Sequence, residues 1–135
     1  MADMVANDAV KSFRSAASER GDARAQNALG NCYFYGGGVV LDLHEAHSWY
    51  TKAAKQGNLQ AKENARACLL ILCGQIFEDE DSAQAYSCYK SASEKNNEKG
   101  MQYLKALMKG MTAAEIAEGE LRYHESKQNP EVDEK

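Results

Sequence analysis

Proline and β-branched side chains are scarce in this sequence. Pro130 is the one proline among 135 residues, whereas alanine is abundant. This composition favours helix over strand, because alanine is the best helix former and strands are enriched in β-branched residues. No apolar run approaches the roughly 20 residues that span a bilayer, and the LLILC segment (69–73) is expected in a protein core. The sequence therefore predicts an all-α protein, and its length fits one domain.

Blocks of basic residues are also missing. The formal net charge is −4, so we expect neither nucleic acid nor an anionic membrane as a partner. The opening MADMVANDAVKSF lacks the basic and apolar regions of an export signal, which predicts a cytoplasmic location. The cysteines are then expected to be reduced thiols that pack as small hydrophobes. They are Cys32, Cys68, Cys73 and Cys88.

The sequence repeats itself. Residues 8–26, 45–62 and 83–102 share one pattern at a spacing of about 36 to 39 residues. In the best copy, apolar residues recur at the spacing of an amphipathic helix with one apolar face; they are Ala46, Trp49, Tyr50, Ala53 and Ala54. A second stripe before it predicts a partner helix; it consists of Ala25, Ala28, Leu29, Cys32 and Tyr33.

Turn and cap signals punctuate these helices. The glycines at 36–38 can take the left-handed backbone that ends a helix and reverses the chain. Helix starts are predicted at Asp42, Asp81 and Thr112, each followed three residues later by Glu or Gln as in a capping box. The expected helices are 5–20, 23–35, 43–56, 59–73, 82–95, 98–109 and 113–126. The first six should pair into about three antiparallel hairpins of a short α-solenoid, and the last should be a capping helix.

The later part of the chain departs from the best copy. CGQIFEDED (73–81) replaces the glycine loop, which predicts a longer preceding helix with Ile76 or Phe77 in the core. In the last helix, apolar residues share one face and EGE (118–120) lies on the other, as suits a terminal cap with a polar outer face. The apolar face carries Ala113, Ile116, Ala117, Leu121 and His124. The acidic tail 127–135 is expected to be disordered.

Residues 25–58 resemble the Sel-1-like repeat, a relative of the tetratricopeptide repeat. The matching positions are Ala25, Leu29, Gly30, Tyr33, Gly36, Gly38, Val39, Asp42, Ala46, Trp49, Tyr50, Lys52, Ala53, Ala54 and Gly57. The resemblance implies a single repeat domain over 1–126, with one well-matched repeat at 23–58, degenerate copies on either side and a cap at 112–126. Some secreted members of the family carry a cysteine pair in each repeat and are associated with β-lactam binding or hydrolysis. Ala54 and Ala61 stand near the positions of that pair, so this activity is not expected here.

Chemistry-bearing residues do not form a convincing catalytic or metal-binding motif. The four cysteines lack the C-x-x-C spacing of zinc sites. His44 and His47 are three apart rather than four and are interpreted as a solvated helix start. No nucleophile elbow and no phosphate loop are found. We therefore expect no enzyme activity, no cofactor and no metal, and we interpret the acidic segment 78–81 as solvated, with docking of a basic partner as the alternative.

The resemblance also points to a binding groove. In related repeats the first helix of each hairpin lines the inner curve, where Asn amides hold a peptide backbone and basic neighbours meet carboxylates. Equivalent residues here are Arg24, Asn27, Asn31, Phe34, Gln60, Glu63, Lys99 and Gln102. The alternative is that these are ordinary solvent-exposed helix residues. Replacement of Asn27 and Asn31 by Ala is expected to weaken binding without lowering stability.

The sequence thus predicts a protein or peptide-binding adaptor that is a monomer or a weak homodimer. Two other classes remain open. A dedicated inhibitor, such as an immunity protein for a toxin enzyme, would have one very tight partner. A hydrolase or metal-dependent enzyme would bind zinc or turn over β-lactam or ester probes.

Overall fold

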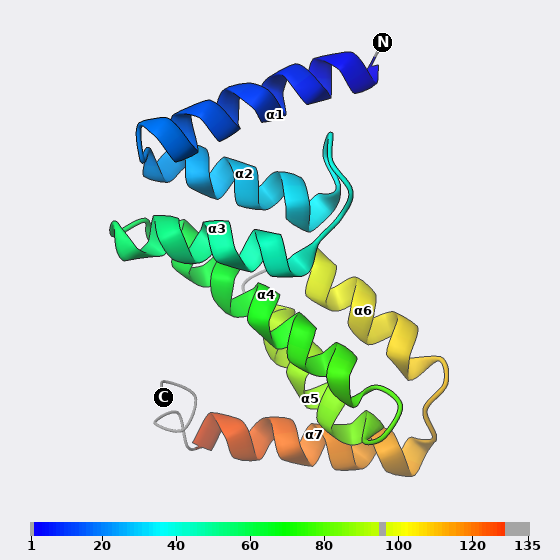
Figure 1. Ribbon diagram of the computed structural model, residues 1–135. Coiled ribbons are helices and arrows are strands. Elements are labelled where there is room, and N and C mark those ends of the chain that lie inside the picture. Colours follow the sequence, from blue (N-terminus) through cyan, green and yellow to red (C-terminus); the bar gives the residue numbers. More distant parts are fainter. Residues whose placement is uncertain (1, 95–96, 129–135) are drawn as a thin grey trace. The chain divides into compact units, whose positions relative to one another are not determined.

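The computed structural model describes residues 2–94 and 97–128, which form seven helices and no strand (Figure 1). The helices are α1 (Ala2–Glu19), α2 (Ala23–Tyr35), α3 (Leu43–Lys55), α4 (Leu59–Phe77), α5 (Ser82–Ala92), α6 (Glu98–Met108) and α7 (Ala113–Gln128). The predicted all-α class and the expected helix order are confirmed. The tail predicted to be disordered from 127 starts inside α7, and residues 129–135 lie outside the described residues.

The chain divides into two compact units, residues 1–68 and 69–135. Unit 1 contains α1, α2, α3 and the first half of α4, and unit 2 contains the second half of α4 with α5, α6 and α7. A single domain over 1–126 stays a prediction, because compactness alone does not say whether the units fold independently.

The glycine loop after α2 ends the helix as the sequence predicts. Gly36 has φ 73°, and its N–H donates to the carbonyl of Cys32. Such a left-handed backbone carries little penalty without a Cβ. Asp42 then starts α3, because its carboxylate accepts from the N–H groups of His44 and Glu45 at 3.0 and 3.1 Å.

The two later start signals are confirmed as well. The Asp81 carboxylate accepts from the N–H of Gln84 at 3.2 Å. At α7 the capping box is complete, since the Thr112 N–H donates to the Glu115 carboxylate at 2.8 Å and the Glu115 N–H donates to the Thr112 hydroxyl at 3.2 Å. Each bond satisfies a donor that the first helical turn leaves unpaired.

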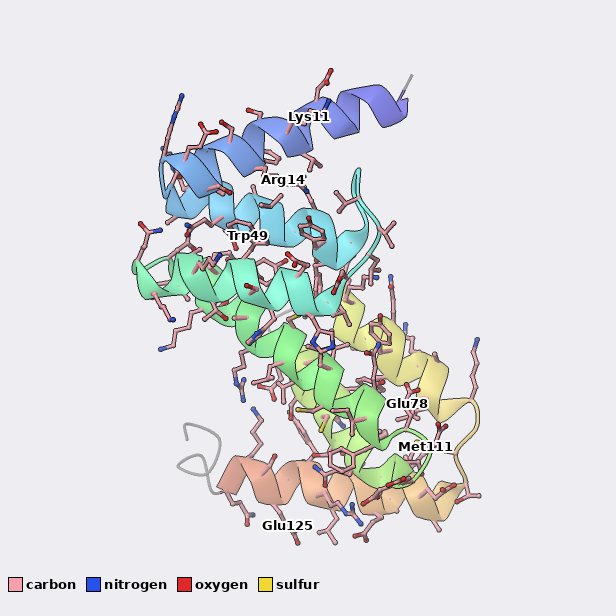
Figure 2. All side chains as sticks on the ribbon, viewed as in Figure 1. Lys11, Arg14, Trp49, Glu78, Met111 and Glu125 are labelled. Carbon is pink, nitrogen blue, oxygen red and sulfur yellow. The ribbon has the colours of Figure 1, made fainter. Side chains whose placement is uncertain are left out.

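Unit 1 is held together by small residues that let its helices approach closely. A Cβ placed on Gly30 of α2 would lie 2.6 Å from the ring of Tyr50 on α3, so the ring rests on the α2 backbone. Tyr50 is 1% exposed. Between α1 and α2, Arg14 donates to the hydroxyl of Tyr33 at 2.8 Å, and Arg14 can be followed on α1 in Figure 2.

Unit 2 repeats this arrangement around α5. The ring of Tyr89 lies against Gly74 of α4, and the ring of Tyr86 lies against Gly119 of α7. Ala85 and Ala92, which stand 39 residues after Ala46 and Ala53, are buried like them. Ser82 and Tyr86 of α5 bond Glu115 and Glu120 of α7, and Glu94, just after α5, bonds Tyr123 further along α7. The two helices therefore run parallel.

The orientation predicted for α7 is wrong. Gly119, from the EGE segment that was expected to face solvent, is buried against Tyr86. Leu121, expected inside, is 53% exposed, and Ala117 and His124 are exposed too. The reason is that Tyr86 requires a glycine to receive its ring, and Glu120 next to that glycine binds both the Tyr86 hydroxyl and the Lys90 ammonium.

The end of α4 also differs from expectation. The helix is longer than 59–73, as the missing glycine loop indicates, but neither Ile76 nor Phe77 enters the core. Ile76 is 74% exposed and Phe77 is 37% exposed. The inner face of this segment is already filled by Ile71, which is fully buried, and by Gly74 beneath Tyr89.

Gly30→Ala is predicted to destabilise the protein although alanine is the better helix former. Overpacking against the Tyr50 ring costs about 1–3 kcal/mol, whereas the helix gains about 1 kcal/mol. We expect a net loss of up to about 2 kcal/mol in the free energy of unfolding, measured by urea titration with circular dichroism. The matched Gly110→Ala variant, whose Cβ would meet nothing closer than 3.9 Å, should lose none. Equal stability of the two variants would show that Tyr50 does not rest on α2.

Glu120→Gln is predicted to destabilise the protein in a pH-dependent way. Hydrogen bonds from Lys90 and Tyr86 hold the pKa of Glu120 below its usual value. This carboxylate therefore stabilises the fold above its ordinary pKa of 4.5, and the contribution disappears as pH falls through the lower folded pKa. We expect a loss of about 0.5–1 kcal/mol at pH 7, which decreases as the pH falls below 4.5. Glu125→Gln on the same helix (Figure 2) is the control and should change nothing across this pH range.

Candidate functional site

Three amide side chains form a hydrogen-bonded row across α2 and the first half of α4. Gln60 Nε2 donates to Asn64 Oδ1 at 3.2 Å, and Asn64 Nδ2 donates to Asn27 Oδ1 at 3.1 Å. We name Gln60, Asn64 and Asn27 the amide ladder. Asn27 and Asn64 are 37 residues apart, one repeat length, so they occupy similar places on successive first helices. The sequence prediction included Gln60 and Asn27 but missed Asn64.

The ladder keeps free hydrogen-bonding groups at its two ends. Within the described part of the chain, neither the Asn27 amide nitrogen nor the Gln60 amide oxygen takes part in a hydrogen bond. Gln60 is exposed and Asn27 is half-buried. A side-chain amide offers two donors and an oxygen acceptor, so the row presents donors at one end and an acceptor at the other. A peptide backbone offers the complementary groups.

Asn31 has a structural role that the sequence does not reveal. The Tyr50 hydroxyl donates to Asn31 Oδ1 at 2.6 Å. Since the Tyr50 ring is buried, this bond satisfies a hydroxyl that would otherwise be stranded in the core. Burial also raises the pKa of Tyr50 well above its usual value. The expectation that Asn31 can be replaced without loss of stability is therefore revised, although its amide nitrogen, half-buried like the rest of the side chain, is still unused.

Phe34 is buried and is not available to a partner. It is 2% exposed, with its ring 4.9 Å from that of Tyr35 and 6.0 Å from that of Tyr50, measured between centroids. Its place in the predicted groove was wrong, because spacing along a helix places a residue on a face but does not say whether a neighbouring helix covers it.

The remaining predicted groove residues divide between the units. Arg24 and Glu63 belong to unit 1 and are exposed, and Glu63 has an interaction within the chain. Lys99 and Gln102 lie on α6 in unit 2, where the Lys99 ammonium is 5.8 Å from the centre of the Tyr103 ring. Of the predicted groove residues, the ladder brings together only Asn27 and Gln60.

Cys68 and Cys88 are buried as expected, whereas Cys32 and Cys73 are half-buried, and all four are free thiols. The Cys68 thiol donates to the carbonyl of Leu43 at 2.9 Å. Burial raises the pKa of Cys68 to about 12 and that of Cys88 to about 11. Both are protonated thiols at neutral pH, and a thiol in this state is a poor nucleophile and a poor metal ligand.

Histidine and the acidic segment take part in local structure. Burial, and secondarily His44, lower the pKa of His47. The Tyr89 hydroxyl donates to Glu78, and Asp81 both caps α5 and pairs with Arg122 at 2.7 Å. Among residues 2–94 and 97–128, no three His, Cys, Asp or Glu side chains are grouped as a metal would require, and no helix is long and apolar enough to cross a membrane.

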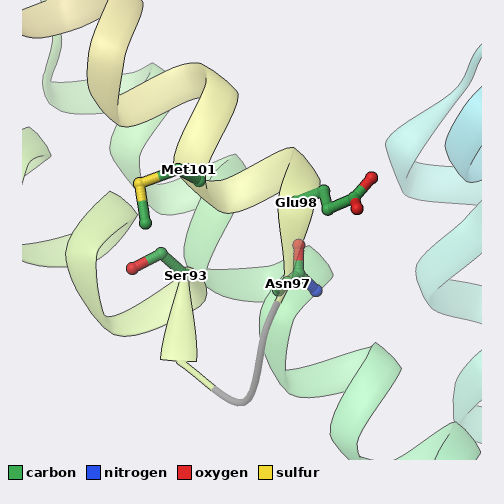
Figure 3. A pocket seen from close by; sticks show the side chains of 4 residues that line it. All are labelled: Ser93, Asn97, Glu98 and Met101. Carbon is green, nitrogen blue, oxygen red and sulfur yellow. The ribbon is translucent and has the colours of Figure 1, made fainter.

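A pocket lies where α5 ends and α6 begins (Figure 3). It is lined by Ser93, Asn97, Glu98 and Met101. Asn97 also caps α6 by accepting from the Gly100 N–H at 2.9 Å. The pocket contains none of the predicted site residues.

Comparison with known proteins identifies the repeats. A family model described as Sel1 repeat matches residues 23–58 and 65–97, together just over half of the chain. The chain is similar to c5321, a protective antigen present in uropathogenic Escherichia coli strains, whose crystal structure displays an SLR fold, with 30% identity and a TM-score of 0.39. This similarity covers 88% of the present chain and 25% of that one, so the chain spans a quarter of its length. No curated protein sequence matches.

Asn31→Ala is predicted to destabilise the protein by about 1–3 kcal/mol, because the buried Tyr50 hydroxyl loses its acceptor. In a Tyr50→Phe background the same replacement should cost much less, since no hydroxyl is left unsatisfied. Urea titrations of the two single variants and the double variant measure this coupling.

Asn27→Ala is the control for that cycle. Its hydrogen bond joins two partly exposed amides, so we expect a change within about 0.5 kcal/mol. If Asn31→Ala and Tyr50→Phe change the free energy of unfolding additively, Asn31 is not the acceptor that satisfies the Tyr50 hydroxyl.

Proposed function

The chain belongs to the Sel1 repeat family, and from that premise we propose that it is a non-catalytic binding module whose amide ladder receives an extended segment of a partner protein. Repeats of this family generally mediate protein–protein interaction. The observation that carries the proposal is the pair of unused hydrogen-bonding groups at the ends of a row of amides that is already fixed in place.

The chemistry of the ladder matches an extended peptide. A backbone in this form presents N–H and C=O groups that helices and sheets would otherwise pair. The Asn27 nitrogen would donate to a partner carbonyl, and the Gln60 oxygen would accept from a partner N–H. The unused nitrogen of Asn31, one turn further along α2, adds a second donor on the same helix face.

Preorganisation favours binding at this place. Asn64 holds both Asn27 and Gln60, so little rotamer freedom remains to be lost when a partner docks. The exposed cation Arg24 lies one turn before Asn27 and forms no ion pair among the described residues. It would favour a partner segment with an acidic side chain beside the bonded backbone.

A non-catalytic role fits the state of the thiols. Nucleophilic catalysis by cysteine uses a thiolate, whereas burial keeps Cys68 and Cys88 protonated. The carboxylates of Asp81 and Glu120 are engaged in ion pairs that connect the start and the body of α5 to α7. Their role is to hold helices together.

The proposal predicts that Arg24→Glu combined with Gln60→Ala removes the partner while the fold stays intact. Both side chains are exposed, so a melting curve should be unchanged within experimental error. The measurement is quantitative mass spectrometry of proteins captured from the native host by the original chain and by the variant. The captured amount of any protein that binds the ladder should fall by about tenfold or more, which is the loss expected for one good charge-assisted hydrogen bond.

Lys62→Glu is the matched control. It reverses a charge at another exposed position of α4, on the side of the helix away from Gln60. Capture that decreases equally in both variants would indicate a general charge effect and contradict a ladder site. A single captured protein bound very tightly would favour the inhibitor class, and several weaker ones the adaptor class.

A further inference from the structure

The second half of α4 exposes large apolar side chains to solvent. Leu69 is 50% exposed, Ile76 is 74% exposed and Phe77 is 37% exposed. With the half-buried Cys73 they stand at i, i+4, i+7 and i+8, so they form one stripe along the helix. This stripe lies within unit 2.

The opposite face of the same segment is buried. Ile71 is fully buried, and Gly74 contacts the ring of Tyr89. This part of α4 therefore carries apolar side chains around most of its circumference, with the exposed Gln75 as the polar exception. Helices of that kind are normally covered on every side, and contiguous exposed apolar side chains mark sites of interaction. The exposed stripe accordingly needs an occupant that the core of unit 2 does not supply.

The charge around the stripe indicates what that occupant carries. Glu78, Asp79 and Glu80 follow Phe77 directly and are all exposed. No ion pair is recorded for Asp79 or Glu80 among the described residues. The carboxyl end of a helix adds partial negative charge at the same place. A cationic group therefore gains most at this end of the stripe.

We infer that Leu69, Cys73, Ile76 and Phe77, with Asp79 and Glu80 at their end, form a docking surface for a basic amphipathic helix of a partner protein. We name it the apolar–acidic face. Side chains at i, i+3, i+4 and i+7 of an incoming helix match a stripe that repeats once per turn, and Lys or Arg beyond them meets the carboxylates. The surface is independent of the amide ladder, since it shares no residue with it.

A pair of peptides tests this directly. Both are about 18 residues long, the length at which an isolated helix begins to be stable. Each has leucine at positions i, i+3, i+4 and i+7 and carries a fluorescein label. One carries lysine at the remaining positions and the other glutamate. Fluorescence anisotropy with the full chain measures the affinity of each. We expect the lysine peptide to bind at least about tenfold more tightly at about 50 mM salt, and the preference to shrink at about 300 mM salt.

Variants locate the binding. Ile76→Ser should weaken the lysine peptide about tenfold, while Val40→Ser, which changes a side chain that is 87% exposed in unit 1, should leave it unchanged. Asp79→Asn with Glu80→Gln should weaken binding at low salt only, with Glu125→Gln as control. Because these side chains are exposed, melting curves should match the original chain, which separates lost binding from lost folding.

Other outcomes overturn the inference. Equal affinity for the two peptides, or equal effects of Ile76→Ser and Val40→Ser, would remove the apolar–acidic face as their site. If the chain alone sediments as a dimer that Ile76→Ser converts to a monomer, the occupant is a second copy. The ladder variant Arg24→Glu with Gln60→Ala should bind the lysine peptide normally, so failure of this surface and failure of the ladder are distinguishable.

Discussion

The contact on which the rest of the structure depends is a tyrosine ring resting on a glycine of the neighbouring helix. Among the described residues it occurs three times, as Tyr50 on Gly30, Tyr89 on Gly74 and Tyr86 on Gly119; in each case an added Cβ would lie 2.6 Å or less from the ring. A glycine inside a helix is unfavourable by itself, but here it lets two backbones approach within the thickness of one ring. Each such pair then fixes the spacing of its two helices.

The hydroxyl of each of these tyrosines finds an acceptor on the helix or loop that supplies the glycine. Tyr50 donates to Asn31, which follows Gly30, Tyr86 donates to Glu120, which follows Gly119, and Tyr89 donates to Glu78, four residues after Gly74. The ring and the hydroxyl therefore bind the same segment, which fixes both the spacing and the rotation of the helices. The side-chain oxygens of Asn31 and Glu120, next to two of the glycines, thus take part in the helix packing.

This pairing explains which parts of the fold the sequence could predict. Helix starts depend on local chemistry, so Asp42, Asp81 and Thr112 could be recognised as caps without knowledge of the neighbours. The Gly36 turn was predictable for the same reason. The face that α7 turns inward depends on Tyr86, which is more than thirty residues away, and counting apolar residues along α7 led to the wrong face. Ile76 and Phe77 were misplaced because their apolar character indicated burial, while Gly74 and Ile71 already filled the core.

The candidate site was predictable only in part. Asn27 and Gln60 could be found from repeat spacing, but Phe34 proved to be core. Asn64 was missed because its role depends on a contact across one whole repeat.

The central claim is that three tyrosine rings rest on glycines of neighbouring helices, and nuclear Overhauser spectroscopy of the intact chain tests it most directly. Strong cross-peaks are expected from the ring protons of Tyr50, Tyr89 and Tyr86 to the α-protons of Gly30, Gly74 and Gly119, respectively. Absence of these cross-peaks, with the ring protons instead close to residues of other helices, would contradict the account.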